Sequence, residues 1–355
     1  MKKKILILIS NNGTDSRFRK LIKSLKDNDF QPHALLAFPK NENHQFSNKS
    51  NLIEINNFSS TRIFYSYKNI LFSFYTFFFL IYFRLKGFNR LHVCDEQALI
   101  FVPYVKLLFS KVVLDIYDSM YLKFPLLKFI IPQSVLHKLV HLIIVTDNDR
   151  LSLLSNQSKK KTIVIPNYPK KEDIIDLIDL PKKIFNKNKI TIGYFGSMVK
   201  DRGIEFMYNL LKYSEIDVIC GGWCYDEFSK KFINHNKVTY VGILEQKEIF
   251  KILRHKVDYL MAIYPNNNLN NIYASPNKIW EASILDVPLI INSETKISNY
   301  VKKENLGLVI SCKNINFSET VNLLKNYSNN SKKTKNKFWD DSIIPLLDFY
   351  KSNLI

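Results

Sequence analysis

Short apolar runs alternate along this chain with segments in which apolar residues recur at helical spacing. The run Lys4–Ser10 predicts a buried strand, and Asp15–Asp27 predicts a helix with its apolar residues on one face. Further strands are predicted at His33–Ala37, Arg90–Cys94, Val112–Ile116, Leu142–Thr146 and Thr162–Pro166. Because strands that alternate with helices form parallel sheets covered on both faces, the first half is predicted to be an α/β domain.

The pattern starts again after Pro181–Lys189, a basic and polar stretch that predicts a linker. A strand at Ile190–Phe195 and a helix at Gly203–Tyr213 begin the second series. Its later strands are predicted at Asp217–Cys220, Val238–Val241, Asp258–Ala262, Pro288–Asn292 and Leu306–Ile310. The sequence therefore predicts an α/β protein with two Rossmann-like parallel-sheet domains that face a cleft.

We place the N-terminal domain at residues 1–168, the linker at 169–189 and the C-terminal domain at 190–335. Amphipathic spacing predicts one last helix over Phe338–Lys351. We expect the segment 336–355 to pack back on the N-terminal domain.

The most apolar stretch is Ile70–Phe83, ILFSFYTFFFLIYF. A helix of this length measures about 21 Å, short of the roughly 30 Å of a bilayer core, so no membrane span is predicted. Two interpretations stay open: a helix buried against the sheet, or a helix lying in a membrane surface. The apolar and basic stretch Tyr121–Val140 favours membrane contact, as do the nearby cations Lys68, Arg84, Lys86, Lys123, Lys128 and Lys138.

The composition excludes a disordered chain, because 355 residues include 26 Phe and 19 Tyr. The formal net charge is +19, and residues 1–161 carry 24 Lys and Arg against 11 Asp and Glu. Nucleic acid, anionic lipid or phosphorylated substrates all suit such a basic half. No nucleic-acid-binding module is recognisable, so we expect no nucleic-acid partner.

Cys220 and Cys224 lie in CGGWC without a second pair at zinc-like spacing, which favours reduced thiols over a metal site. The N-terminus MKKKILILIS resembles a signal peptide, but its apolar core is short and no small-residue cleavage site follows. We therefore predict a first strand and a cytoplasmic protein.

The strongest candidate site is Tyr273–Leu285, YASPNKIWEASIL. Ser275 is predicted to cap a helix and Pro276 to begin it, which leaves backbone N–H groups that suit a diphosphate. Lys278 adds a positive charge, and Glu281 can accept hydrogen bonds from ribose hydroxyls. The alternative is an ordinary capped helix.

The second candidate is Tyr194–Gly203, YFGSMVKDRG, where a strand ends at Gly196 and a helix is predicted from Gly203. Lys200 and Arg202 lie in the loop between them and can neutralise the phosphate of a leaving nucleotide. The alternative is a solvated basic turn.

These two segments resemble motifs of the retaining glycosyltransferases of family 4, which have the GT-B fold. Tyr194–Gly203 is similar to their G-R-L-x-x-x-K-G segment, and SPNKIWEASILDVPLII to their P-x-K-L-x-E-x-x-A-x-G-x-P-V-I segment. Four N-terminal segments also agree, in the same order: ILILISNNGTDSRFRK, LHVCDEQAL, VVLDIYDS and IPNYP. Each motif is loose, but together they cover most of the chain.

The resemblance implies that Arg202 contacts the donor diphosphate, that Glu281 holds the ribose, and that Gly13 lies near the donor phosphates and the acceptor. With Lys278, the first two are the catalytic candidates. The donor-binding candidates are Gly13, Gly196, Ser197, Lys200, Ser275 and Asn277. The acceptor-side candidates are Asp15, Arg17, His92, Asp95 and Asp118.

Three positions depart from the family pattern: Ser197 replaces an arginine, Tyr273 a glutamate and Tyr117 a histidine. An inactive homologue therefore stays open, as does a nucleotide-sugar epimerase on the same fold.

The resemblance implies transfer of a sugar from a nucleotide-sugar donor with retention of anomeric configuration, the leaving phosphate accepting the acceptor's proton. We expect a polyprenyl-diphosphate-linked glycan acceptor, as in bacterial O-antigen or capsule assembly, at an anionic membrane surface on the inner face of the cytoplasmic membrane. Neither a cofactor nor a metal is expected. The pair Asp147 and Asp149 follows a strand of the first domain, where a helix cap is predicted instead of a metal site.

Overall fold

The computed structural model describes residues 3–11, 13, 15–39, 59–65, 71–100, 102–313, 315–327 and 337–352. The chain divides into two compact units, Met1–Pro166 with Trp339–Ile355, and Asn167–Phe338. Lys68 and Ile70, which entered the membrane hypothesis, lie outside the described residues.

Unit 1 contains a seven-stranded sheet in the order β3-β2-β1-β4-β5-β6-β7, and every described strand pair is parallel. Its strands are β1 (Lys3–Ile9), β2 (Phe30–Pro39), β3 (Ser59–Tyr65), β4 (Arg90–Cys94), β5 (Lys111–Asp115), β6 (Leu142–Val145) and β7 (Thr162–Val164). Its helices are α1 (Ser16–Asp27), α2 (Leu71–Leu85), α3 (Glu96–Ile100), α4 (Val105–Leu108), α5 (Met120–Lys123), α6 (Leu127–Ile130), α7 (Gln133–His137), α8 (Asn148–Ser152), α9 (Asn156–Lys159), α18 (Trp339–Ser342) and α19 (Ile344–Lys351).

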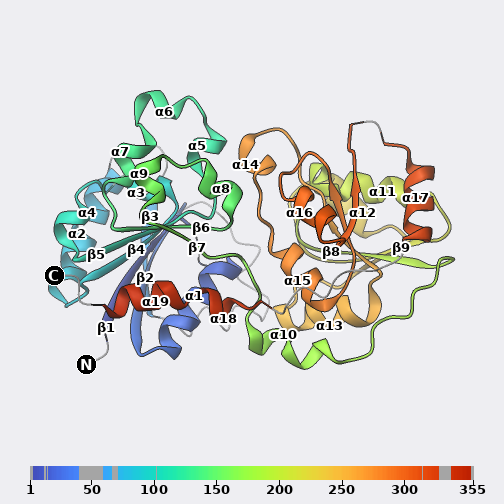
Figure 1. Ribbon diagram of the computed structural model, residues 1–355, viewed down its shortest axis with the longest axis horizontal. Coiled ribbons are helices and arrows are strands. Elements are labelled where there is room, and N and C mark those ends of the chain that lie inside the picture. The colour runs from blue at the N-terminus through green and yellow to red at the C-terminus, as the bar shows by residue number, and fades with distance from the viewer. Residues whose placement is uncertain are drawn as a thin grey trace. The chain divides into compact units, whose positions relative to one another are not determined.

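Side-chain alternation along β1 divides the core of unit 1 between two faces of the sheet. Leu6 and Leu8 pack in one cluster with α2 to α5 and α7, through residues such as Leu80 and Val105. The opposite face lies against α1, α18 and α19, which Figure 1 shows together on one side of the sheet. Both faces are buried, which explains why these strands are apolar throughout.

Unit 2 contains a six-stranded parallel sheet in the order β10-β9-β8-β11-β12-β13. Its strands are β8 (Ile190–Met198), β9 (Ile216–Cys224), β10 (Val238–Tyr240), β11 (Tyr259–Ala262), β12 (Leu289–Asn292) and β13 (Gly307–Ile310). Its helices are α10 (Lys171–Ile178), α11 (Glu205–Leu210), α12 (Glu227–Ile233), α13 (Gln246–Lys256), α14 (Leu269–Ile272), α15 (Asn277–Leu285), α16 (Ser298–Lys303) and α17 (Phe317–Asn326), with a π-helical turn η2 (Lys200–Ile204). One core cluster joins the sheet to α11, α12 and α17, and the other joins it to α10, α13, α15 and α16.

The predicted fold class is confirmed, and four details of the element prediction are wrong. Helix α10 lies inside the expected linker 169–189, because Ile174 and Leu177 are buried in the core of unit 2. The single helix predicted over Phe338–Lys351 is divided into two, α18 and α19. Pro345 explains the break, because proline is tolerated in the first turn of a helix and not in its interior. Strand β3 was not predicted, and the helix expected from Gly203 begins after η2.

Trp339 connects the C-terminal segment to unit 1. Its side chain is fully buried, its Nε1 donates to Ser24 Oγ at 2.9 Å, and the Arg17 guanidinium lies 5.2 Å from its ring centroid. Trp339→Ala is therefore expected to reduce the free energy of unfolding by about 3–5 kcal/mol. Urea titration followed by far-UV circular dichroism measures this change. Leu107→Ala, at a side chain that is 89% exposed, is the control, and an equal loss in both variants would contradict the prediction.

Candidate active site

The strand order of unit 2 reverses between β8 and β11, because the chain continues from β8 to β9 on one side and reaches β11 on the other. In open parallel sheets, ligands bind beyond the carboxyl ends of the strands at such a switch point. Both predicted donor segments lie there. Residues 196–204 form the end of β8 and the turn that follows it, and α14 and α15 follow β11.

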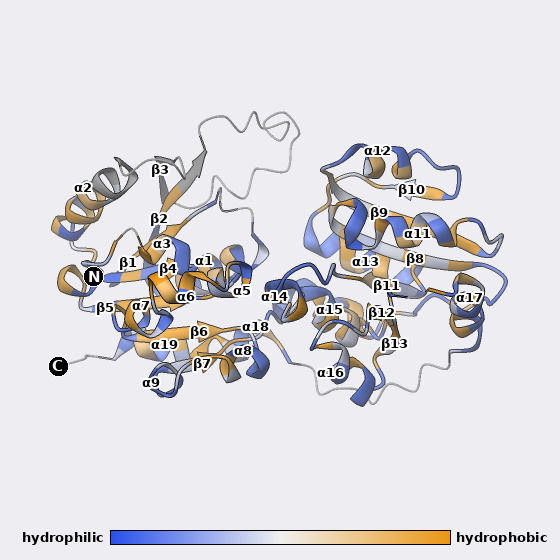
Figure 2. Cartoon of the chain, turned by 90° about the horizontal axis from the view of Figure 1, so that it is seen from above, coloured by the Kyte–Doolittle hydropathy of each residue, from blue (hydrophilic) through white to orange (hydrophobic). Residues whose placement is uncertain are grey.

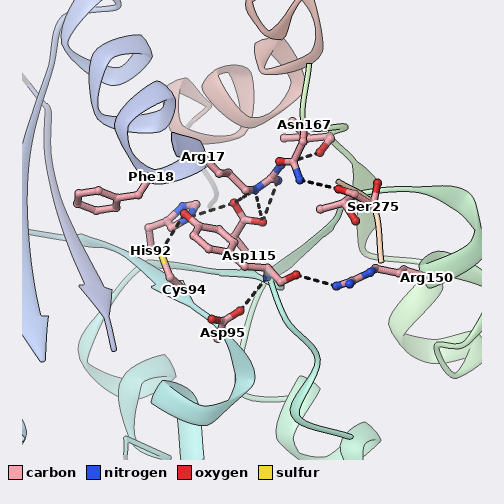
Figure 3. Close-up of polar contacts among 12 residues, drawn as sticks. Arg17, Phe18, His92, Cys94, Asp95, Asp115, Arg150, Asn167 and Ser275 are labelled. Atoms are coloured by element: carbon pink, nitrogen blue, oxygen red, sulfur yellow. Dashed lines mark hydrogen bonds and ion pairs between the residues drawn. The ribbon is translucent and has the colours of Figure 1, made fainter. Parts of the chain in front are cut away.

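The N-terminus of α15 differs from the predicted cap. The helix begins at Asn277, and Pro276 occupies the N-cap in an extended conformation without a side-chain cap. Ser275 is therefore not the cap, and the prediction that Pro276 begins the helix is wrong by one residue. The Ser275 hydroxyl is buried and has no hydrogen-bond partner among the described residues, and the Ser275 carbonyl accepts a hydrogen bond from Asn167 Nδ2 at 3.2 Å (Figure 3). A buried, unpartnered hydroxyl beside a helix N-terminus is a group that a bound anion can satisfy.

Lys278, in the first turn of α15, lies over an aromatic ring. Its Nζ is 3.8 Å from the ring centroid of Tyr194, a cation–π contact. The pKa of Lys278 is lowered to about 7, mainly by burial; the charge of Glu281 opposes this shift and the charge of Arg202 adds to it. These electrostatic interactions bring the three predicted catalytic residues into one cluster.

Aromatic side chains that the sequence did not identify support this cluster. Tyr194 Oη donates to the carbonyl of Ser197 at 2.7 Å, which fixes the ring beneath Lys278. The Arg202 guanidinium lies 5.8 Å from the Tyr264 ring centroid. Asn292 holds the Tyr264 backbone on both sides, accepting from its N–H at 2.9 Å and donating to its carbonyl at 3.0 Å. Tyr194 stood inside a predicted motif, but nothing in its spacing indicated the contact with Lys278.

Glu281 lies one turn further along α15 and is 8% exposed. Its Oε1 accepts a hydrogen bond from Gln246 Nε2 at 2.8 Å. Gln246 begins α13, and no sequence pattern indicated this pairing. The contact fixes one carboxylate oxygen of the predicted ribose ligand.

The loop after β8 separates its two cations. Arg202 belongs to the Lys278 cluster, whereas Lys200 Nζ pairs with Glu205 at 3.3 Å and the Lys200 N–H donates to Asp226 at 2.7 Å. At Gly196, φ is 131°, and a Cβ there would meet no atom within 4 Å. The backbone of Gly196 is thus open to the close approach of a ligand, next to Ser197.

Unit 1 has its own switch point, between β1 and β4. Gly13 follows β1 with φ of 75°, and its N–H donates to Asn11 Oδ1 at 2.8 Å. Asp15 caps α1 by accepting from the Arg17 and Phe18 N–H groups. Asp118 is exposed and pairs with Lys123 at 2.9 Å.

Arg17 and His92 are core residues of unit 1. The Arg17 guanidinium binds Asp115 at 2.9 Å, as Figure 3 shows, and it also donates to the Ile165 carbonyl at 2.9 Å. His92 Nδ1 lies 2.9 Å from Tyr350 Oη, and its Nε2 lies 3.6 Å from Asp115. Burial alone would raise the pKa of the Asp115 carboxyl, but its interactions with Arg17 and His92 keep that pKa below its usual value. With exposed fractions of 2% and 0%, these two acceptor-side candidates connect β4, β5 and α1 and do not reach the surface.

Asp95 follows β4, and its φ of 71° is a left-handed backbone conformation that residues other than glycine seldom adopt. Its Oδ1 accepts from the Tyr117 and Asp118 N–H groups at 2.8 and 2.9 Å. The pKa of Asp95 is raised to about 7, mainly by burial; the hydrogen bonds from the Asp118 and Tyr117 N–H groups oppose this shift, and the charge of Asp118 adds to it. This carboxyl is the one acceptor-side candidate that is both strained and strongly perturbed.

Asp147 accepts from the Arg150 N–H at 2.8 Å as the N-cap of α8, which confirms the predicted helix cap. Among the described residues, no group of three or more His, Cys, Asp or Glu is placed to hold a metal ion. Cys220 and Cys224 are free thiols.

Unit 1 also carries an exposed apolar surface on the helices that cover the α2 side of its sheet. On α2, Phe78, Tyr82 and Leu85 recur at helical spacing and are 65%, 52% and 83% exposed. The other members, on α4 to α7 and their connections, are Leu107, Phe124, Leu126, Phe129, Ile130 and Val135. Figure 2 shows the hydrophobic colour of α2. We call these nine residues the apolar surface; no helix of the described residues is long and apolar enough to span a membrane.

No protein-family model matches the sequence, and no curated protein does. Solved structures do match. HepE of Anabaena in complex with UDP and glucose is 14% identical, with a TM-score of 0.63 over 91% of this chain and 89% of that one. Sucrose-phosphate synthase of Thermosynechococcus elongatus is 12% identical, with a TM-score of 0.61 over 97% and 95% of the two chains.

A third match is the UDP-GlcNAc 2-epimerase of Methanocaldococcus jannaschii, 10% identical, with a TM-score of 0.58 over 98% of this chain and 99% of that one. At such identities the likeness concerns the fold alone. Two parallel α/β units and these full-length matches establish that this chain has the GT-B fold.

Proposed function

We propose that this protein is a glycosyltransferase that moves a sugar from a nucleotide-sugar donor to a lipid-linked glycan in bacterial surface-polysaccharide assembly. The observation that carries the proposal is the N-terminus of α15. There the buried Ser275 hydroxyl finds no hydrogen-bond partner in the part of the chain that the structure describes, and Lys278 and Arg202 lie close enough to influence each other. A donor diphosphate satisfies all three groups.

The chemistry of transfer explains why these groups are needed. Cleavage of the bond between sugar and phosphate develops negative charge on the leaving diphosphate, and oriented N–H groups and cations stabilise that charge. The backbone of α15, Lys278 and Arg202 supply both kinds of group without a metal ion. Glu281, held by Gln246, is proposed to accept hydrogen bonds from the ribose.

The acceptor is proposed to approach unit 1, where Gly13, Asp15, Asp95 and Asp118 follow β1, β4 and β5. A polyprenyl-diphosphate-linked glycan requires a membrane surface, and the apolar surface of unit 1 offers one contact for it. Residues 71–90 and 119–141 include no Asp or Glu, which suits anionic headgroups. We therefore propose peripheral binding at the inner face of the cytoplasmic membrane.

An epimerase is the second candidate, because a UDP-GlcNAc 2-epimerase shares the fold. A soluble sugar nucleotide is its entire substrate, so an epimerase has no use for the apolar surface. This feature favours the transferase.

A panel of UDP-glucose, UDP-GlcNAc, ADP-glucose and GDP-mannose tests the proposal. We expect slow hydrolysis of one donor without acceptor, and faster release of its nucleoside diphosphate when detergent extracts of polyprenyl-linked glycans are added. A new sugar epimer without nucleotide release would establish the epimerase instead. No turnover of any donor and no binding by calorimetry would identify an inactive homologue.

Lys278 predicts a pH dependence of donor binding. Since its pKa is lowered to about 7, the amine loses its charge as the pH rises through that value. A bound diphosphate favours the charged form, so binding takes up a proton and affinity falls above about pH 7. This proton uptake is measured by calorimetry in buffers with different ionisation enthalpies. The ligand is the intact sugar nucleotide that the panel identifies as the donor. A sugar nucleotide is the right probe because its diphosphate has no ionisation near neutrality.

Lys278→Met is the matched variant, since it keeps the length of the side chain and removes the titrating group. We expect it to bind more weakly and without proton uptake. Equal uptake in both proteins would place the titrating group elsewhere.

A further inference from the structure

We propose that the donor sugar is a hexuronic acid, whose carboxylate binds Lys296 while its ring lies against Tyr273. This inference rests on the proposed transferase function and names the class of sugar that the same site takes. All the residues concerned belong to unit 2.

The direction of the donor along α15 locates its sugar. A sugar nucleotide is linear, with the diphosphate between the ribose and the sugar. Glu281, the proposed ribose ligand, lies four residues beyond Asn277, or roughly 6 Å along the helix axis. Since the diphosphate is proposed to bind at the helix N-terminus, the sugar continues past that N-terminus, toward the residues that precede Ser275. Tyr273 is one of these residues.

A ring and a cation come together at this place. The Lys296 N–H donates to the Ile272 carbonyl at 2.8 Å, and Lys296 Nζ lies 5.9 Å from the Tyr273 ring centroid. The backbone contact joins the segment before α16 to the end of α14, beyond the carboxyl ends of the adjacent strands β11 and β12. An aromatic face suits the C–H groups of a sugar ring, and an ammonium group suits a carboxylate.

The charge around Lys296 is not neutralised. The connection between β11 and α15, residues 263–276, contains five Asn and no Asp or Glu. No carboxylate of the described residues forms an ion pair with Lys296, and the nearby Glu294 accepts hydrogen bonds from Asn292 Nδ2 and the Cys312 N–H, both at 3.1 Å. At position 273 the family pattern has a glutamate, which would repel a sugar carboxylate, whereas this chain has a neutral ring. These features favour an anionic group on the sugar over a hydroxyl.

Three pairs of donors that differ only at C6 of the sugar test the proposal. They are UDP-glucuronate with UDP-glucose, UDP-galacturonate with UDP-galactose, and GDP-mannuronate with GDP-mannose. The release of nucleoside diphosphate gives kcat/KM for each donor. In the pair that the wild type uses best, kcat/KM for the uronate is expected to exceed that for the hexose by about tenfold or more, the usual effect of a hydrogen bond to a charged group.

Lys296→Met removes the charge and keeps the length of the side chain. We expect kcat/KM for the uronate to fall by about tenfold or more and kcat/KM for the hexose to stay unchanged. Lys296→Glu should go further and prefer the hexose. Lys302→Met, at an exposed lysine of α16, has the same change of net charge and should keep the wild-type preference. A change of preference between two sugars separates a sugar contact from a structural role.

Two results would overturn the hexuronic acid and leave the transferase intact. One is a wild type that turns over a neutral sugar donor as fast as, or faster than, every uronate. The other is an equal fall for both sugars in Lys296→Met, because that result would assign Lys296 to the diphosphate that the two donors share. Failure of the wild type to turn over any of these six donors or any donor of the panel would instead overturn the proposed function.

Discussion

Replacing Arg202 and Lys278 together by methionine should reduce kcat/KM for the donor by about 100-fold or more. A hydrogen bond to a charged group contributes roughly 1.5–3 kcal/mol, so each side chain accounts for about tenfold or more. Methionine preserves the contact of position 278 with the Tyr194 ring and much of the volume at position 202, so the variant tests charge and not packing. The reduction in kcat/KM is measured as the rate at which nucleoside diphosphate is released from the donor that the panel identifies.

A control with the same change of net charge is available in the same unit. Lys230 and Lys251 form exposed ion pairs with Glu227 and Glu248 at 2.6 and 2.7 Å, and surface pairs of this kind contribute little. Lys230→Met/Lys251→Met should therefore retain wild-type kcat/KM. If the first double variant were as active as this control, the diphosphate would not bind at α15.

Substitutions in the apolar surface should release the protein from anionic vesicles. Phe129 and Ile130 on α6 are 85% and 77% exposed, and burial of each such side chain contributes about 1.5–3 kcal/mol. Phe129→Ser/Ile130→Ser is therefore expected to weaken vesicle binding by more than about 100-fold. Sedimentation with phosphatidylglycerol vesicles at low salt measures the binding.

The chain contains a matched pair in unit 2, because Ile184 and Phe185 are also adjacent and are 89% and 43% exposed. Ile184→Ser/Phe185→Ser should bind vesicles like the wild type. Binding of the wild type should also weaken as salt rises, since each cation near the surface contributes about 1 kcal/mol through a screened interaction. A wild type that never sediments with anionic vesicles would remove the membrane contact and favour a soluble acceptor.

The apolar helix after residue 70 shows what hydrophobicity alone leaves open. The sequence allowed either a buried or an interfacial helix, and the structure contains features of both. Leu80 and Phe83 are buried in the core, while Phe78, Tyr82 and Leu85 are exposed. A helix that is apolar on every side carries no periodic signal, so its orientation depends on tertiary contacts.

Buried parallel strands were the most predictable part of the fold, because continuous runs of branched apolar residues are characteristic of them. The candidate site was predicted only in part. Residue types near strand ends identified Arg202, Lys278 and Glu281, but the ring of Tyr194 and the amide of Gln246 reach them through contacts with no fixed spacing in sequence. The unpartnered Ser275 hydroxyl shows the same limit, since a serine before a proline and a helix is usually a cap.

The division of the chain into units determines the order in which the two units can finish folding during synthesis. Unit 2 is continuous and complete at Phe338, whereas unit 1 needs α18 and α19 to cover one face of a sheet whose last strand ends at Val164. Until a ribosome has released Trp339 and Tyr350, the α1 side of that sheet lacks its last helices and exposes apolar surface. The domain that is translated first is thus the last to finish folding, and a nascent chain stalled near residue 338 is expected to be a chaperone substrate with a folded unit 2.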